Sequence, residues 1–212
     1  MKGLSRELLI ETGLRLLDEV GLDGLSVRRL AAELGVQSPA LYWHVKTKQE
    51  LLEGMASAII MAAGMGPPEG DETWPVWLRR RAQAYRKSLL SHRDGARLIT
   101  SARRAPEALA GFERELEAMV GLGFTPALAL HTIMVIADYT NGFVLQEQAI
   151  QSAPSPQELE MLARMPTLSE AFKTGGYRQP DAAFAHGIDV IVAGTEALLP
   201  PRGIGWAHGS RG

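Results

Sequence analysis

Apolar residues recur at every third or fourth position along most of the chain, and no long segment alternates apolar with polar residues. Recurrence of this kind is typical of one face of an α-helix, whereas a half-buried strand needs the alternation. The pattern therefore predicts an all-α fold. Besides a short helix between Ser26 and Gly35, we expect helices at about 6–20, 39–45, 48–63, 74–91, 94–101, 106–121, 126–149, 156–164 and 181–198.

The ends of the first helices are marked by local signals. Ser5, Ser26 and Thr47 are of the types that cap helix N-termini, and Ser38-Pro39 combines a capping serine with a proline at the first helical position. Gly21 and Gly35 suit the left-handed position that ends a helix. The sequence thus predicts three helices before residue 47 and a fourth directly after it.

Residues 26–46 have the parts of a helix-turn-helix. Leu30 and Leu34 are spaced to pack inward from the first short helix, a turn follows at 35–37, and Leu41 and Val45 repeat the inward spacing in the second. In this motif the second helix enters the major groove of DNA. The pattern therefore predicts a DNA-binding unit at the N-terminal end of the chain.

The outward side of this second helix carries an aromatic and polar set. Ala40 is suited to contact with a thymine methyl, and Tyr42, His44 and Lys48 can donate to phosphates or bases. Pro39 and Trp43 complete the face, and Arg28 at the start of the preceding helix can reach phosphate or guanine.

The alternative is that Tyr42 and Trp43 belong to a hydrophobic core. That arrangement would bury His44 and Lys46 as well, or twist them away, and burying an unpaired charge is costly. We therefore favour the interpretation in which this face meets DNA.

The run from Leu25 to Leu52 resembles the DNA-binding module of the tetracycline-repressor (TetR) family, with Gly21 and Gly24 placed upstream as in that family. Residues 90–96 resemble a later segment of the family's tetracycline-binding members, so the resemblance extends more loosely over most of the chain. It implies roughly nine or ten helices and a homodimer held by a four-helix bundle, built from helices 126–149 and 181–198 of each subunit.

The resemblance also implies a set of DNA contacts and an operator that differs from that of the tetracycline-binding members. Ser38 and Ala40 differ from the polar pair that the tetracycline-binding members use to read bases, which indicates another operator sequence. The predicted DNA-binding residues are Arg28, Ser38, Pro39, Ala40, Tyr42, Trp43, His44 and Lys48.

The expected helix 126–149 is apolar but interrupted by polar residues. His131 and Asp138 share a stripe with Met134, whereas Tyr139, Phe143 and Gln146 lie on another. Buried polar groups need partners, so one stripe could face a ligand; alternatively, these groups satisfy each other across a dimer interface. Helical spacing and the resemblance add three further candidates, Tyr85, Phe112 and Leu116. The predicted ligand-binding residues are therefore Tyr85, Phe112, Leu116, His131, Met134, Asp138 and Gln146.

The resemblance bears on metals too. Tetracycline-binding members hold the drug as a magnesium chelate through histidines and a carboxylate, and Gly64, Ile99 and Gln146 stand at those positions here. None is a good Mg²⁺ ligand, because this ion prefers charged or strongly polar oxygen. We expect no cofactor and no metal, and a small-molecule effector that is apolar and partly aromatic.

Composition changes this picture little. The chain has no cysteine, which excludes disulfides and thiolate sites, and its longest apolar runs, 58–63 and 133–137, fall short of the ~20 residues of a membrane span. Arg6 and Glu7 interrupt what a signal peptide would need, so a cytoplasmic protein is expected. The net charge of -2 is not that of a typical DNA binder, but the segment 26–48 is locally basic.

Two other classes of protein are the alternatives. A helical enzyme would need a nucleophile, metal or phosphate motif, and the sequence has no His-Glu-x-x-His, Gly-x-Ser-x-Gly or P-loop pattern. A DNA-binding or interaction protein without ligand control would have a tightly filled second half, and a cavity there would argue against it. The expectation is therefore a repressor with a helix-turn-helix domain at 1–47, a connecting helix at 48–63, a ligand-binding and dimerisation domain at 64–199 and a disordered tail at 200–212.

Overall fold

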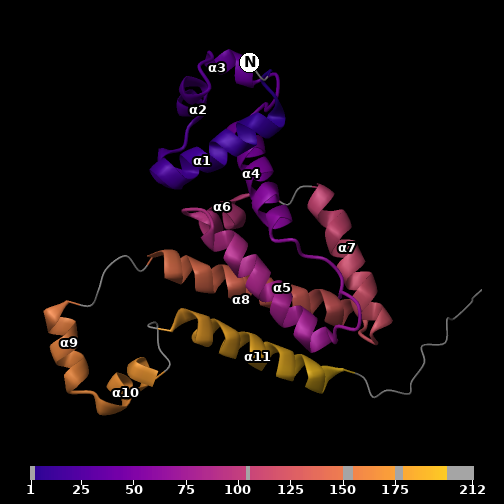
Figure 1. Cartoon of the computed structure of the whole chain (residues 1–212), viewed down its shortest axis with the longest axis vertical. Coiled ribbons are helices and arrows are strands. Elements are labelled where there is room, and N and C mark those ends of the chain that lie inside the picture. Colours follow the sequence, from indigo (N-terminus) through magenta and orange to yellow (C-terminus); the bar gives the residue numbers. More distant parts are fainter. Residues whose placement is uncertain (1–2, 104–105, 150–154, 175–178, 200–212) are drawn as a thin grey trace, which may run out of the picture.

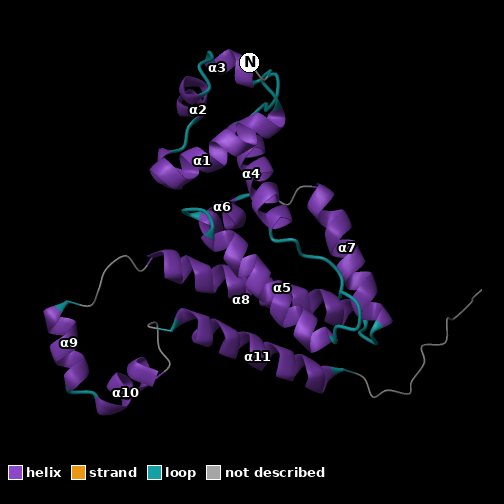
Figure 2. Cartoon of the chain, viewed as in Figure 1, coloured by secondary structure: helices purple, strands orange, loops and turns teal. Residues whose placement is uncertain are grey.

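The computed structural model describes residues 3–103, 106–149, 155–174 and 179–199, and within these ranges every regular element is a helix (Figure 2). The all-α prediction is confirmed. The helices are α1 (Arg6–Gly24), α2 (Val27–Glu33), α3 (Ser38–Leu41), α4 (Lys48–Ala62), α5 (Trp74–Leu90), α6 (Gly95–Ser101), α7 (Pro106–Gly121), α8 (Pro126–Ala149), α9 (Pro156–Ala163), α10 (Pro166–Thr174) and α11 (Pro180–Leu198).

Helices α1 to α3 form a small unit at one end of the molecule, and α4 leads from it into the larger helical part (Figure 1). Leu9, Leu30, Leu41 and Met55 are fully buried in the core that this unit shares with α4. Three predicted caps are confirmed: the hydroxyls of Ser5, Ser26 and Thr47 accept from the backbone N–H groups three residues on, at 3.2, 3.2 and 3.0 Å. Local sequence therefore sets where these helices begin.

Two helices, α1 and α3, differ from the prediction at their ends. Gly21 has the expected positive φ of 69°, but the helical segment continues across this kink to Gly24 instead of ending near residue 20. Helix α3 starts one residue earlier than predicted, with Gln37 and not Ser38 as its cap, and it ends at Leu41. Beyond Leu41 the backbone forms a tighter turn of the 3₁₀ type, because the N–H of His44 donates to the Leu41 carbonyl three residues back, at 2.9 Å.

The larger part is organised around α8, which packs against α5, α6, α7 and α11. Its core includes Trp77, Met119, Ile136 and Phe184, none of them more than 1% exposed. By length and composition alone α8 is also apolar enough to cross a membrane, although its longest uninterrupted apolar run covers only residues 133–137. Its contacts on several sides show that this apolar character serves the centre of a helical bundle.

Helices α9 and α10 pack on each other to one side of this bundle (Figure 1). The sequence predicted α9 but not α10, so the expected nine or ten helices become eleven in the described residues. Pro166 at the first position of α10 was an available start signal, and Leu168 and Phe172 give it helical spacing. The tail 200–212, expected to be disordered, lies outside the described residues.

Candidate DNA interface and ligand cavity

The short α3 and the turn after it present an exposed aromatic pair. The Trp43 side chain is 87% exposed and Tyr42 is 50% exposed, whereas Leu41 and Val45 on either side are buried. This arrangement overturns the alternative in which the two aromatic residues belong to the core. A large indole that stays exposed gives up the stabilisation that its burial would provide to a monomeric fold. The exposed face is therefore suited to contact with a partner.

The other predicted DNA-binding residues lie in the same region. Gly35, with a φ of 68°, makes the turn that sets α3 across α2. Neighbouring Arg29 is used within the fold, because its Nη1 donates to the Gly24 carbonyl at 3.3 Å. Of the predicted set, Arg28, Pro39 and Lys48 are exposed like the aromatic pair, and Ser38, Ala40 and His44 are partly exposed.

The turn between α5 and α6 fastens this unit to the larger part. Asp94 adopts a left-handed φ of 57°, and its Oδ2 accepts the backbone N–H of Leu22 at 2.8 Å, just after the kink in α1. Asp18 of α1 accepts the N–H of Arg93 at 2.9 Å and lies 3.0 Å from His92 Nδ1. Backbone and side-chain groups of the α5–α6 turn thus bond to α1 at Asp18 and again one helical turn later at Leu22.

Two further side chains extend this junction. Arg97 of α6 bonds to Asp23 at 3.0 Å, and this guanidinium holds the pKa of the Asp23 carboxyl below its ordinary value. From the other side, the Gln148 amide of α8 donates to the His92 carbonyl at 2.8 Å. The sequence analysis marked residues 90–96 only by their resemblance to the family, and it did not indicate Asp18, Asp23 or Gln148, because no local pattern distinguishes these three from surface residues.

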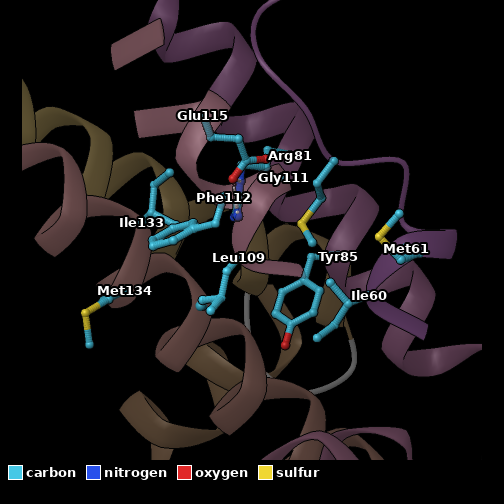
Figure 3. A pocket seen from close by; sticks show the side chains of 12 residues that line it. Ile60, Met61, Arg81, Tyr85, Leu109, Gly111, Phe112, Glu115, Ile133 and Met134 are labelled. Atoms are coloured by element: carbon cyan, nitrogen blue, oxygen red, sulfur yellow. Dashed lines mark hydrogen bonds and ion pairs between the residues drawn. The ribbon is translucent and has the colours of Figure 1, made fainter. Parts of the chain in front are cut away.

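A cavity of about 130 Å³ lies between α4, α5, α7 and α8 (Figure 3). Three of the predicted ligand-binding residues, Tyr85, Phe112 and Met134, line it. The complete lining is Ile60, Met61, Met65, Arg81, Tyr85, Leu109, Gly111, Phe112, Glu115, Ile133, Met134 and Ala137.

The remaining predicted ligand residues lie elsewhere. Leu116 packs against the core around Trp77, and His131, Asp138 and Gln146 are exposed on α8 and are not part of the lining. Asn141, another polar interruption of α8, accepts a hydrogen bond from the Tyr85 hydroxyl through its Oδ1 at 2.9 Å. The structure therefore separates Met134 from His131 and Asp138, which the sequence had placed on one stripe.

Sequence reasoning missed a buried ion pair in the cavity wall. Arg81 of α5 and Glu115 of α7 are joined at 2.8 Å, with side chains only 6% and 4% exposed. Arg81 is the third of three successive arginines, and Glu115 occupies an inward position of an amphipathic helix. An acidic residue at an inward helical position was the signal that could have indicated it.

The donor chemistry does not fit a magnesium chelate. Gly64 and Ile99 offer no side-chain oxygen, and Gln146 offers a neutral amide on the exposed side of α8. The one carboxylate in the cavity lining, Glu115, is already bonded to the cationic Arg81. Within the described residues no group of three histidine or acidic side chains is placed to hold a metal ion.

An exposed helix-turn-helix joined by a bonded turn to a helical bundle with a cavity defines a class: a DNA-binding transcriptional regulator with its own ligand-binding part. Family models agree over both parts. Residues 9–55 match the bacterial regulatory proteins of the tetR family, and residues 66–199 match the tetracyclin repressor-like C-terminal domain. The chain belongs to the TetR family.

Individual relatives are similar over nearly the whole chain. Tetracycline repressor protein class C of Escherichia coli is 37% identical over 204 residues, covering 93% of each chain. A single-substitution variant of TetR from Acinetobacter baumannii AYE, solved in complex with minocycline, has a TM-score of 0.77 at 33% identity and covers 93% of this chain and 99% of that one. ActR of Streptomyces coelicolor, in complex with actinorhodin, has a TM-score of 0.80 at 25% identity, with 95% and 99% covered.

Proposed function

We propose that this TetR-family regulator is a repressor that binds a palindromic operator as a homodimer and is released when an uncomplexed small molecule fills the cavity between α4, α5, α7 and α8. The observation that carries the proposal is the bonded α5–α6 turn. It joins α1 of the DNA-binding unit to α8, which also lines the cavity. A regulator of this kind acts in the cytoplasm, where the DNA is.

On the DNA side, α3 and the following turn enter the major groove. Trp43 and Ala40 face the bases, while Tyr42, His44 and Lys48 meet phosphates at the groove edges. The exposure of Tyr42, Trp43 and Lys48 supports this assignment. In a two-fold dimer the two α3 segments then lie about 34–36 Å apart, one turn of DNA.

The dimer is formed by the outward faces of α8 and α11. Val135 and Val190 are 50% and 58% exposed on these helices, and Gly142 and Gly194 have open space where a Cβ would be. Small and apolar residues of this kind allow close helix packing. The exposed His131 and Asp138 lie on the same helix outside the cavity, which favours the interface alternative for these two residues.

The effector is mainly apolar and is bound without a metal. Several relatives are tetracycline repressors, but the residues aligned with their magnesium ligands do not offer the oxygen donors that Mg²⁺ needs. Phe112, Ile133 and Leu109 instead give the cavity an aromatic and aliphatic wall. Other relatives of the same fold bind different compounds, as the ActR complex with actinorhodin illustrates.

Release from the operator requires that the ligand bind one of two dimer conformations more tightly. A ligand with equal affinity for both conformations does not change the equilibrium between them. Filling the cavity pushes on α8, and Gln148 passes this displacement to the α5–α6 turn at His92. The turn then moves α1 through Asp18 and Leu22. Ligand and operator are therefore mutually antagonistic, since coupling between two sites is reciprocal.

The DNA assignment is tested with the double variant Tyr42→Ala/Lys48→Ala. Loss of one cationic phosphate contact per subunit should reduce the slope of log affinity against log salt by about two, and binding should weaken on all sequences. Lys87→Ala removes an exposed lysine of α5 far along the chain from α3 and serves as the control. Unchanged affinity and salt slope in the double variant would refute the recognition-element assignment.

The metal-free effector is tested by titrating tetracycline, with and without Mg²⁺, against the protein–operator complex. We expect no efficient release in either case. Efficient release that depends on Mg²⁺ would show that a magnesium chelate is accommodated despite Gly64, Ile99 and Gln146. Operator binding itself would remain established in that outcome, so the two parts of the proposal fail separately.

A further inference from the structure

The buried ion pair in the cavity wall leaves two polar atoms without partners. Both Nε and Nη2 of Arg81 donate to the same oxygen of Glu115, Oε2, at 3.0 and 2.8 Å. Arg81 Nη1 and Glu115 Oε1 are buried and have no hydrogen-bond partner within the part of the chain that the structure describes. One donor and one acceptor therefore remain open on adjacent side chains.

Such an arrangement is costly unless something else completes it. An arginine and a carboxylate usually pair through two nitrogens and two oxygens, which would satisfy both carboxylate oxygens. Here Oε2 receives both bonds and Oε1 receives none. Buried polar groups in folded proteins are almost always hydrogen-bonded, so an open donor and acceptor beside a cavity indicate a partner of matching chemistry.

The surroundings define the rest of that partner. Figure 3 shows the ends of Arg81 and Glu115 meeting beside the ring of Phe112, with Ile133 close to it. The charges of the pair cancel. A free carboxylate in the cavity would therefore gain Arg81 but face Glu115, and a cation would face Arg81. The site accordingly favours an uncharged molecule with a large apolar part.

We propose that Arg81 and Glu115 select the effector by binding an uncharged group that carries a hydrogen-bond acceptor and a hydrogen-bond donor side by side, as in a primary amide or a hydroxy-ketone. The acceptor accepts a hydrogen bond from Arg81 Nη1, and the donor donates one to Glu115 Oε1. The inference rests on the proposed function, because it assumes that this cavity holds the effector.

Side chains of the lining must move when the ligand binds. The two open atoms are covered, and the cavity of about 130 Å³ is smaller than the ~300–1,000 Å³ of typical ligand sites. Met61, Met65 and Met134 line it, and methionine is flexible enough to reshape an apolar wall. The three methionines therefore adapt the apolar part, while the ion pair reads the polar group.

A purely structural role is the competing explanation, since the pair also joins α5 to α7. The two roles differ in ligand discrimination. A structural pair would not distinguish ligands of equal shape, whereas the proposed site rejects an analogue that lacks the donor and leaves Oε1 unpaired.

The experiment compares three probes of similar shape by calorimetry, without DNA: 2-naphthamide, 2-acetonaphthone and 2-naphthoate. The ketone keeps the acceptor and lacks the donor, and the naphthoate is an anion with acceptors only. We expect the amide to bind about ten-fold more tightly than the ketone, and the naphthoate to bind most weakly. Equal affinity for amide and ketone, tightest binding of naphthoate, or no binding of any probe at millimolar concentration would each overturn the proposal.

The double variant Arg81→Met/Glu115→Leu tests the residues themselves. Replacing a buried ion pair with apolar residues of similar volume is often tolerated, and helical circular dichroism checks the fold. The amide-to-ketone ratio should fall to about one or below, whereas the control Arg80→Met/Glu72→Leu, which removes the neighbouring pair outside the cavity, should keep it. A ratio preserved in the Arg81 and Glu115 double variant would overturn the proposal.

If the double variant does not fold, Glu115→Gln removes the negative charge and keeps the shape of the side chain. We expect this substitution to lower the ratio of the naphthamide affinity to the acetonaphthone affinity at least several-fold. An unchanged ratio contradicts the proposal. Operator binding is measured on the same preparations. Intact operator binding with no discrimination among the probes means that the ligand inference fails while the regulator assignment stands.

Discussion

Asp94 is the residue whose replacement tests the junction between the two parts most directly. It has a left-handed φ of 57°, and its carboxylate accepts the Leu22 N–H at 2.8 Å across 72 positions of sequence. Three substitutions separate these two features. Asp94→Asn keeps an oxygen acceptor and a residue type that tolerates the left-handed region, Asp94→Gly loses the acceptor without adding strain, and Asp94→Ala loses the acceptor and adds backbone strain. All three variants also lose the exposed ion pair between Asp94 and Arg97, so this loss does not distinguish them.

The magnitudes follow from these contacts. A hydrogen bond to a charged group contributes about 1.5–3 kcal/mol, and the lower end applies here because the Asp94 side chain is 19% exposed. A left-handed conformation costs alanine a further ~1 kcal/mol. We therefore expect losses in the free energy of unfolding of about 2–3 kcal/mol for Asp94→Ala, about 1.5 kcal/mol for Asp94→Gly and under about 1 kcal/mol for Asp94→Asn.

The assay is urea unfolding at one fixed protein concentration, because the stability of a dimer depends on concentration. Hydrogen exchange of the Leu22 amide adds a local readout: protection should fall in Asp94→Gly and Asp94→Ala but persist in Asp94→Asn. Equal unfolding midpoints for the alanine and asparagine variants, or unchanged Leu22 protection in all three, would show that this bond does not hold the units together.

Two further predictions concern the dimer and the pH dependence. Val190→Glu places a charge on the exposed face of α11 and should give monomers in sedimentation, whereas Val120→Glu on the exposed side of α7 should leave a dimer; dimeric Val190→Glu would contradict the proposed interface. The hydrogen bond from Arg97 lowers the pKa of Asp23 below 3.8, so its contribution to stability is present above that pH and is lost as the pH falls through the lowered pKa. Asp23→Asn should therefore unfold at lower urea than the parent at pH 7, with the difference closing below about pH 4, and a difference that persists in acid would rule out this linkage.

Much of the N-terminal unit could be predicted because its signals are local. Ser5, Ser26 and Thr47 cap helices in the structure as their sequence context predicts, since a capping side chain bonds to backbone only three residues away. The inward placement of Leu41 and Val45 also follows from helical periodicity, and it leaves Trp43 exposed. The exposed aromatic face of α3 and the turn after it therefore follows from local sequence without any tertiary contact.

The ligand side was predicted less well, because periodicity gives a residue's face on its own helix but not what covers that face. Met134, His131 and Asp138 share one stripe of α8 and are all exposed, yet only Met134 lines the cavity between α4, α5, α7 and α8. The identity of each neighbour depends on how helices far apart in sequence pack together. No rule of spacing within α8 supplies that information.

By itself, the sequence determined the helical class, the capped helix-turn-helix and its exposed aromatic face, since each depends on backbone and side-chain groups within a few residues of one another. Only the tertiary structure decided the pairing of Arg81 with Glu115, 34 residues later, and the bond from Asp94 to Leu22, 72 residues earlier. Such contacts arise when packing buries one charged or polar group beside another, because a buried group must find its partner wherever the fold places one.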